Sequence, residues 1–211
     1  MISIELKESI GVIGNKIKQA FAEEINTLVK KREKNILSQC KDLVSAWIIS
    51  QPEVQSLNDH SVGSLAGQFG LHPGQDLIAT KEIVDAVESS VQVKFIPFDK
   101  KLNGGFFVYF QPSNFQNLLS LGSGHVVDSS SDLHWLDWLL TQGDTIIVVG
   151  YSYNPESGIG RSGLGSMTDG GSFRIPPQFS GNVDNNFITR ALIGSMQEGQ
   201  IADIFKKELG I

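Results

Sequence analysis

The stretch "IGVIGNKIKQAFAEEINTLVKKREKNILSQCKDLVSAWI", residues 10–48, carries the strongest hydrophobic period of the chain. Its apolar side chains recur in steps of three and four, at Ile10, Ile13, Ile17, Phe21, Ile25, Leu28, Ile36, Cys40, Leu43 and Trp47. This spacing places them on one face of an amphipathic helix, and a register that closes every eleven residues suits a nearly straight helix. Arg32 occupies one position of the stripe. We therefore predict a long N-terminal helix within residues 1–50, with residue 32 as the place where it would break.

Two interpretations of this helix remain open: it lies on the core of its own chain, or it packs partly against a neighbouring subunit. In either case we expect Ile13, Ile17 and Phe21 to be buried and the basic cluster Lys30–Lys34 to be exposed. Replacing Ile17 by Asp would then cost several kcal/mol, because an unpaired charge would face apolar neighbours.

Beyond Pro52 the sequence predicts a polar connector over residues 51–76 and an α+β body over residues 77–211. The segment 75–90 has a helical period, with Leu77, Ile78, Val84 and Val87 expected to face inward. Two alternating segments follow, residues 91–98 and 104–111. The stretch "DKKLNGG" (99–105) between them contains Asn103-Gly104. This dipeptide is a strong signal for a β-hairpin, although the connection is longer than two residues.

The second half of the body alternates short helices and strands. A helix around Trp135 and Trp138 is expected to end at Gly143, and a strand follows over residues 145–153. Near the C-terminus Asp184 is a natural N-cap for a helix with an apolar face, formed by Phe187, Ile188, Ala191 and Leu192. Helices at both ends around a small, mostly antiparallel sheet give an α+β fold.

Composition limits the possible functions. The net charge is −6; residues 1–50 hold eight Lys/Arg against six Asp/Glu, and the rest hold nine against seventeen. An acidic body argues against a protein that gains affinity for duplex DNA by neutralising phosphates. The single cysteine, Cys40, excludes an intramolecular disulfide and fits a reducing cytoplasm. No apolar run approaches the ~20 residues of a membrane span.

Three glycines, Gly158, Gly160 and Gly163, spell G-x-G-x-x-G behind the expected strand. In a dinucleotide site the third glycine opens a helix whose N–H groups receive a pyrophosphate. Residues 164–177 hold three further glycines and two prolines, which oppose a helix. The pattern therefore favours a loop, and no nucleotide or other cofactor is predicted.

A glycine loop of this length is expected to be functional. We predict that residues 154–171 form an extended loop or arm that contacts a neighbouring chain, because glycine allows close backbone approach and arginine forms bidentate pairs with carboxylates. The candidates for the subunit interface are Gly158, Gly160, Arg161, Gly163, Leu164, Met167 and Arg174.

Signals for chemistry are weak. The four histidines, His60, His72, His125 and His134, have no carboxylate or cysteine at helical metal-ligand spacing, so no metal site is predicted. Ser123, His125 and Asp128 are close in sequence, but triads normally unite distant segments. Neither Ser162 nor Ser166 fits G-x-S-x-G. No catalytic residue is predicted; the alternative is a small serine-dependent hydrolase or ligand-binding enzyme that uses the loops 123–128 and 162–166.

One extended pattern resembles a known family. It consists of four segments: "VKFIPFDKKLNGGFFVYFQPSNFQNLLSLGSGHV" (93–126), "LHWLDWLLTQGDTIIVVGY" (133–151), "GRSGLGSM" (160–167) and "SFRIPPQFSGNVDNNFITRAL" (172–192). Together they resemble the tail-completion or neck proteins of tailed bacteriophages, over roughly residues 77–211. In that family a helical N-terminus precedes a small sheet. A Gly/Arg loop then leads to a Pro-aromatic-x-x-Arg-Ala-Leu segment, matched here by "NFITRAL" (186–192). The long first helix and the "WLDWLL" insertion depart from the simpler members.

The resemblance implies a non-enzymatic structural protein that forms a homo-oligomeric ring at the phage head-tail junction. Its partners would be other neck and tail proteins, such as the connector, tail terminator or tail tube. DNA would pass through an acidic lumen without specific binding, since like charge opposes phosphate binding. The expected location is the virion, after assembly in the host cytoplasm, with no membrane partner.

Overall fold

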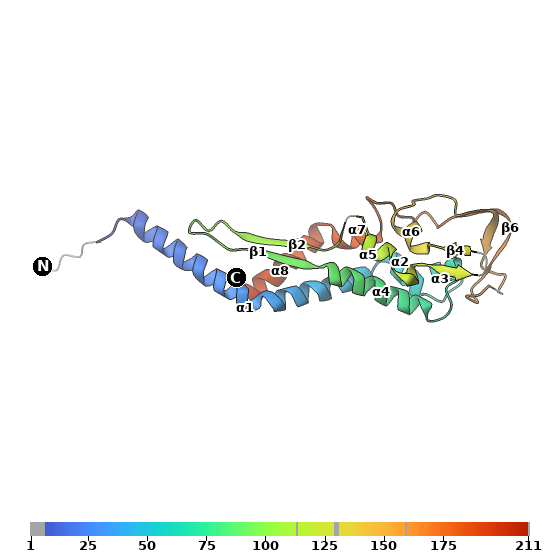
Figure 1. Cartoon of the computed structure of the whole chain (residues 1–211), viewed down its shortest axis with the longest axis horizontal. Helices are drawn as coiled ribbons and strands as arrows, with labels where there is room; N and C mark the ends of the chain where they lie inside the picture. Colours follow the sequence, from blue (N-terminus) through green and yellow to red (C-terminus); the bar gives the residue numbers. More distant parts are fainter. Residues whose placement is uncertain (1–6, 113, 129–130, 159, 211) are drawn as a thin grey trace. The chain divides into compact units, whose positions relative to one another are not determined.

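The fold is described from a computed structural model of the chain, which describes residues 7–112, 114–128, 131–158 and 160–210 (Figure 1). It is α+β, as predicted. In chain order the elements are α1 (Ile10–Ile49), α2 (Pro52–Asn58), α3 (Leu65–Phe69), α4 (Gln75–Ser90), β1 (Gln92–Ile96), β2 (Gly105–Tyr109), α5 (Gln116–Leu119), η1 (Gly122–Gly124), β3 (Val126–Asp128), β4 (Ser131–Leu133), α6 (Trp135–Leu140), β5 (Val148–Asn154), β6 (Ser166–Phe173), α7 (Phe187–Leu192) and α8 (Ser195–Leu209).

The chain divides into two compact units. The first unit contains α1 as far as Cys40, the β1–β2 hairpin, and the residues from Gly199 onward. The second unit contains residues 41–90 and 110–198. Each strand pairs with one neighbour only, so the described strands form three separate two-stranded antiparallel sheets.

Helix α1 confirms the prediction from periodicity and continues without a break through residue 32. Lys30, Lys31 and Lys34 are exposed, as expected. Arg32 differs from them: it is half-buried, and its Nη1 lies 3.9 Å from Glu208 Oε2 on α8. An arginine can occupy the apolar stripe because its stem packs while its charged head reaches a carboxylate.

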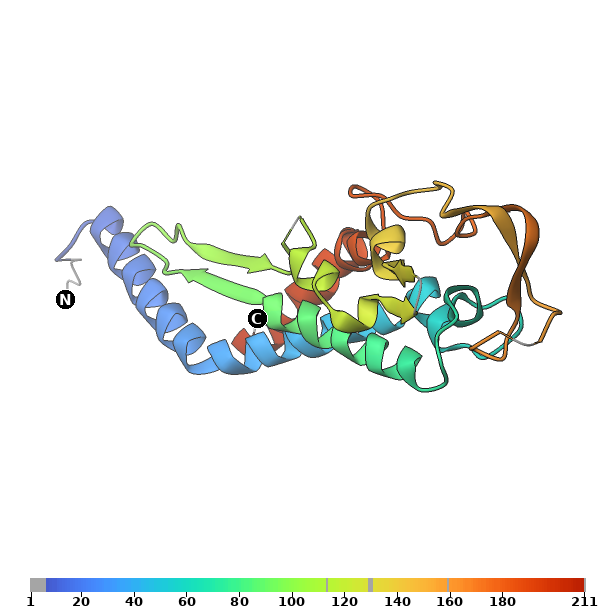
Figure 2. The ribbon, with the colours of Figure 1, turned by 45° about the vertical axis from the view of Figure 1, so that its right-hand side comes forward.

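The N-terminal part of the stripe corrects the sequence prediction. Ile10, Ile17 and Phe21 are 80%, 52% and 61% exposed, and Ile13 is half-buried. Burial of α1 begins at Ala22, because the first turns of the helix extend past the end of the β1–β2 hairpin (Figures 1 and 2). The Ile17→Asp substitution is therefore expected to change the stability of an isolated chain by no more than about 0.5 kcal/mol.

Hydrophobic packing of the first unit lies between α1, the hairpin and α8. The hairpin pairs Val93 with Val108 and Phe95 with Phe106. Phe106 stacks at 4.2 Å between ring centroids on Phe205 of α8. At the hairpin turn the Asn26 side chain of α1 bonds both backbone groups of Phe98, at 2.8 and 3.0 Å. The last polar contact between hairpin and helix therefore falls next to the point where burial of α1 begins.

Cys40 is fully buried in α1, as expected for a packed residue. Burial raises the pKa of its thiol to about 11, so the side chain stays protonated at neutral pH and behaves as a small apolar group.

Two expectations for the helices after α1 are corrected. The predicted connector, residues 51–76, contains α2 and α3, and Pro52 begins α2 because proline suits the first turn of a helix. In α4 Val87 is buried and Val84 half-buried, whereas Leu77 and Ile78 are 61% and 57% exposed. The buried row runs instead through Asp76, Ala79, Ile83 and Val87, which is a helical row displaced from the one that the apolar residues suggested.

The predicted loop 154–171 is also shorter than expected. Residues 166–173 form β6, which pairs antiparallel with β5, so the connection covers only residues 155–165. Gly150, Gly170 and Gly171 have positive φ, and the register shifts between Val149 and Tyr151. Such a bulge keeps glycines inside a strand, which the sequence signals for chain breaks do not reveal.

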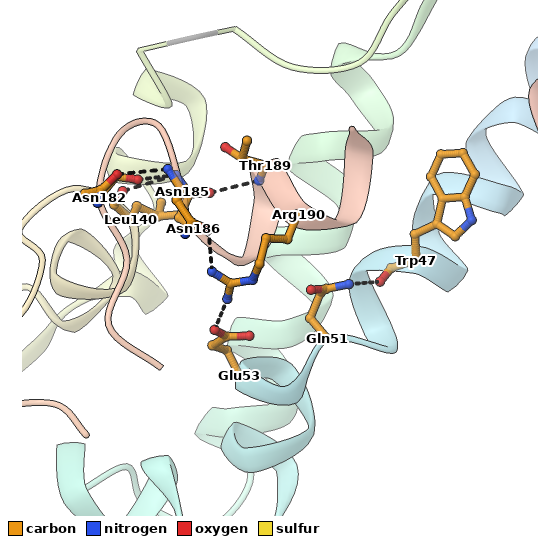
Figure 3. Close-up of polar contacts among 9 residues, drawn as sticks. All are labelled: Trp47, Gln51, Glu53, Leu140, Asn182, Asn185, Asn186, Thr189 and Arg190. Carbon is orange, nitrogen blue, oxygen red and sulfur yellow. Dashed lines mark hydrogen bonds and ion pairs between the residues drawn. The ribbon is translucent and has the colours of Figure 1, made fainter. Parts of the chain in front are cut away.

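Helix α7 buries the predicted face, Phe187, Ile188, Ala191 and Leu192. Its N-cap is Asn186 and not the expected Asp184 (Figure 3). Asn186 Oδ1 accepts the Thr189 N–H at 2.9 Å, and its amide nitrogen donates to the carbonyl oxygens of Leu140 and Asn182. An asparagine can cap and donate simultaneously, so the side chain ties α7 to α6.

No described helix combines the length and the apolar character that crossing a membrane requires.

Candidate functional site

The connection between β5 and β6 folds onto α3 of its own unit. Arg161 Nη2 donates to the carbonyl oxygen of Phe69 at 3.2 Å, and the Tyr153 hydroxyl donates to the carbonyl oxygen of Leu164 at 2.6 Å. Gly67 permits this approach, since a Cβ there would lie 2.9 Å from Leu164 Cβ. Burial raises the pKa of Tyr153, so its hydroxyl remains a donor.

The predicted interface residues are therefore partly engaged within the chain. Arg161 contacts α3, and Arg174 Nη1 lies 3.2 Å from Asp144 Oδ2. Gly160 lies close to Gly165 of the same loop. A Cβ at position 160 would lie only 1.8 Å from the Gly165 carbonyl oxygen. At these residues the loop folds back onto its own chain. Contact of the loop with a second chain stays a prediction.

Five of the predicted interface residues are exposed: Gly158, Arg161, Gly163, Met167 and Arg174. Gly158 and Gly163 have φ of 65° and 73°, in the left-handed region that favours glycine, and both are exposed. Met167 on β6 is 39% exposed, while Leu164 is half-buried against Gly67.

A cleft of about 890 Å³ opens beside the loop, inside the second unit. Its walls include residues 67–70 of α3 and its C-cap, Asp132 of β4, His134 directly after β4, Trp138 of α6, and Arg161. The cleft is large enough for a small molecule, and its polar groups come from three separate segments.

At the rim of this cleft lies a cluster that the sequence reasoning missed. His125 Nδ1 lies 3.3 Å from Asp132 Oδ1, and His134 Nε2 lies 3.2 Å from Asp132 Oδ2. The two imidazole rings have centroids 3.8 Å apart. The search for ligands at helical spacing could not find this cluster, because it is built by a hairpin. The absence of a metal site stays a prediction.

The serine alternative finds little support in the geometry. Ser162 Oγ accepts the Leu164 N–H at 3.2 Å, and Ser166 Oγ lies 2.5 Å from Ser157 Oγ. Ser123 Oγ is buried and has no hydrogen-bond partner among the described residues. His125 faces Asp132, and the side chain of Asp128 lies outside the described part. No Ser–His hydrogen bond is thus present in the part of the chain that the structure describes.

A second candidate surface lies in the first unit. It consists of the exposed residues Ile10, Ile17 and Phe21, which we call the α1 stripe. On β2, Phe107 and Tyr109 are 50% and 53% exposed on the face opposite Phe106; we call them the outer pair. Contiguous exposed apolar surface on a folded chain marks an interaction site.

Comparisons of the chain with protein-family models, with curated proteins and with solved structures found no match.

Proposed function

We propose that this chain is a non-enzymatic structural protein that assembles with copies of itself into a ring, as a neck or tail-completion component of a phage virion. The observation that carries the proposal is the exposure of the α1 stripe. All three of its members, Ile10, Ile17 and Phe21, are more than half exposed on a helix whose later turns are partly buried. An apolar helical face that its own chain leaves exposed is typical of a surface that binds another chain.

We propose a second copy of the chain as that partner. The outer pair on β2 offers an apolar surface that differs from the stripe, and a contact between two different patches is heterologous. Heterologous contacts generate rings when the rotation closes. Helix α1 bends along its length and is not the nearly straight helix expected (Figure 2). The stripe occupies residues 10–21, so it can contact a neighbour along about three turns.

The assignment to phage necks rests on the sequence resemblance over roughly residues 77–211. It agrees with the formal charge of −6, because an acidic lumen lets DNA pass without binding. In this proposal the ring stacks on the connector, the tail terminator or the tail tube, and the chain resides in the virion after assembly in the host cytoplasm.

The test is the double substitution Ile17→Asp with Phe21→Asp. Two carboxylates in the proposed contact face a desolvation cost that no partner offsets, so we expect the variant to elute as a monomer of about 23.0 kDa in size-exclusion chromatography with light scattering. Its circular dichroism and melting should match those of an unaltered monomer, because both side chains are exposed within the chain.

The matched control is Leu77→Asp, which places the same charge at an exposed leucine of α4 in the second unit. This control should assemble like the unaltered chain. Phe107→Asp, in the outer pair, should weaken assembly as the stripe variant does. If the stripe variant keeps the assembled mass, or if Leu77→Asp disrupts it equally, the α1 stripe is not the contact.

A further inference from the structure

We propose that His125, Asp132 and His134 bind one divalent transition-metal ion of the zinc class. Two imidazole nitrogens and one carboxylate oxygen form a donor set that such ions accept. One ligand atom from each residue falls within 4.8 Å of the other two.

Strand register brings the three residues to one face of the β3–β4 hairpin. Val126 pairs with Leu133 and Val127 with Asp132, so His125 and His134 lie opposite each other one position beyond the first pair. Residues that lie opposite each other on paired strands share a face, as His125 and His134 do. Asp132 and His134 share the same face because they are two positions apart. The hairpin therefore gathers ligands that are nine residues apart in sequence.

The distances suit a metal ion. Bonds to zinc of ~2.0–2.1 Å in a tetrahedron place neighbouring donor atoms about 3.3 Å apart. The two nitrogen–oxygen separations in the cluster are 3.3 Å, from His125 Nδ1 to Asp132 Oδ1, and 3.2 Å, from His134 Nε2 to Asp132 Oδ2. Each imidazole nitrogen thus lies beside a different carboxylate oxygen, so an ion would be bound by both oxygens, or by one oxygen after the carboxylate rotates. Without a metal, the same positions suit two N–H groups donating to one carboxylate, so the experiment below must separate these two states.

Neighbouring contacts hold the cluster in place. The Trp135 indole N–H donates to the Ser123 carbonyl oxygen at 2.9 Å, two residues before His125. Gly124 is buried against Leu136, where a Cβ would lie 3.1 Å from Leu136 Cβ. Helix α6 thus supports the segment that carries the first ligand, as a preorganised site requires.

The site would keep a coordination position open. Three protein ligands leave a tetrahedral ion one position for water or another ligand. Asp132 and His134 also line the cleft of about 890 Å³, so a ligand in the cleft can reach the ion. The ion would in addition join two strands of three residues each, a length at which a hairpin has little stability of its own.

The test uses the full chain after treatment with a chelator. Titration with Zn²⁺ followed by calorimetry should give one ion per chain, and Co²⁺ should give the intense visible absorption of a four-coordinate site. Zn²⁺ should also raise the melting temperature, because a ligand that binds only the folded state stabilises it. His125→Ala, His134→Ala and Asp132→Asn should each lower the affinity by more than about tenfold, since even outer-shell changes cost 10–100-fold.

His72→Ala is the matched control, because His72 is exposed and stands outside the cluster; its binding should equal that of the unaltered chain. A cluster held only by hydrogen bonds would show neither stoichiometric Zn²⁺ binding nor the Co²⁺ spectrum, and this result overturns the proposal. Binding that survives in a His125→Ala/His134→Ala variant with native melting overturns it as well.

Discussion

Replacing Trp135 by Ala is expected to lower the free energy of unfolding of the second unit by about 3–5 kcal/mol. Trp135 is fully buried, and its ring stacks on Phe69 with centroids 5.5 Å apart. The truncation leaves a cavity between α6 and α3. It also removes the indole donor and leaves the Ser123 carbonyl oxygen without its 2.9 Å bond, which adds the cost of an unsatisfied buried group.

The measurement is denaturant unfolding of the Trp135→Ala and Trp138→Ala variants. Trp138 lies three residues further along the same helix, but it is only half-buried and lines the cleft. Trp138→Ala should therefore lower the free energy of unfolding much less than Trp135→Ala. Trp135→Phe keeps most of the packing, so its free energy of unfolding should lie between those of the two alanine variants. Equal losses for the two alanine variants would contradict the described core.

Replacing Arg190 by Leu is expected to cost about 3 kcal/mol, the low end of the range for breaking a buried ion pair. Glu53 is 1% exposed on α2, and its Oε1 pairs with Arg190 Nη2 of α7 (Figure 3). Arg190 Nη1 also donates to Asn185 Oδ1 at 3.0 Å. Without the guanidinium, the Glu53 carboxylate stays buried and uncompensated. We choose the low end because the Arg190 side chain is 37% exposed.

A second substitution separates the charge effect from packing. In the double variant Glu53→Leu/Arg190→Leu both charges are gone, and replacement of a buried pair by apolar groups is often neutral or stabilising. The double variant should therefore be more stable than Arg190→Leu alone. Arg174→Leu is the matched control, because its pair with Asp144 is exposed on both sides and is worth at most about 1 kcal/mol. If the double variant loses at least as much free energy of unfolding as Arg190→Leu alone, the buried ion pair is contradicted.

Much of the fold could be predicted from local patterns. The period of three and four gave α1, Asn103-Gly104 gave the hairpin, and the apolar face of α7 was placed correctly. The sequence could not show which part of the apolar face of α1 is buried by the rest of the chain. Burial of α1 begins only at Ala22, one turn before Asn26 contacts the hairpin connection. The end of a distant element has no signal in the helix itself.

The features that the sequence did not predict depend on how strands pair. Strand β6 contains Gly170-Gly171, which read as a chain break but serves a bulged strand. The His125/Asp132/His134 cluster becomes visible only once residues 126–133 are paired as a hairpin, because the relevant spacing is then across strands. The segment "HVVDSSSDLH", two short alternating runs around serines, is the signal that could have found it.

The central claim is that this chain assembles with copies of itself. Native mass spectrometry or sedimentation equilibrium of the unaltered chain over a range of concentrations tests it most directly. We expect one discrete species whose mass is 23.0 kDa multiplied by the number of subunits in a closed ring. A mass of 23.0 kDa at every concentration would contradict it.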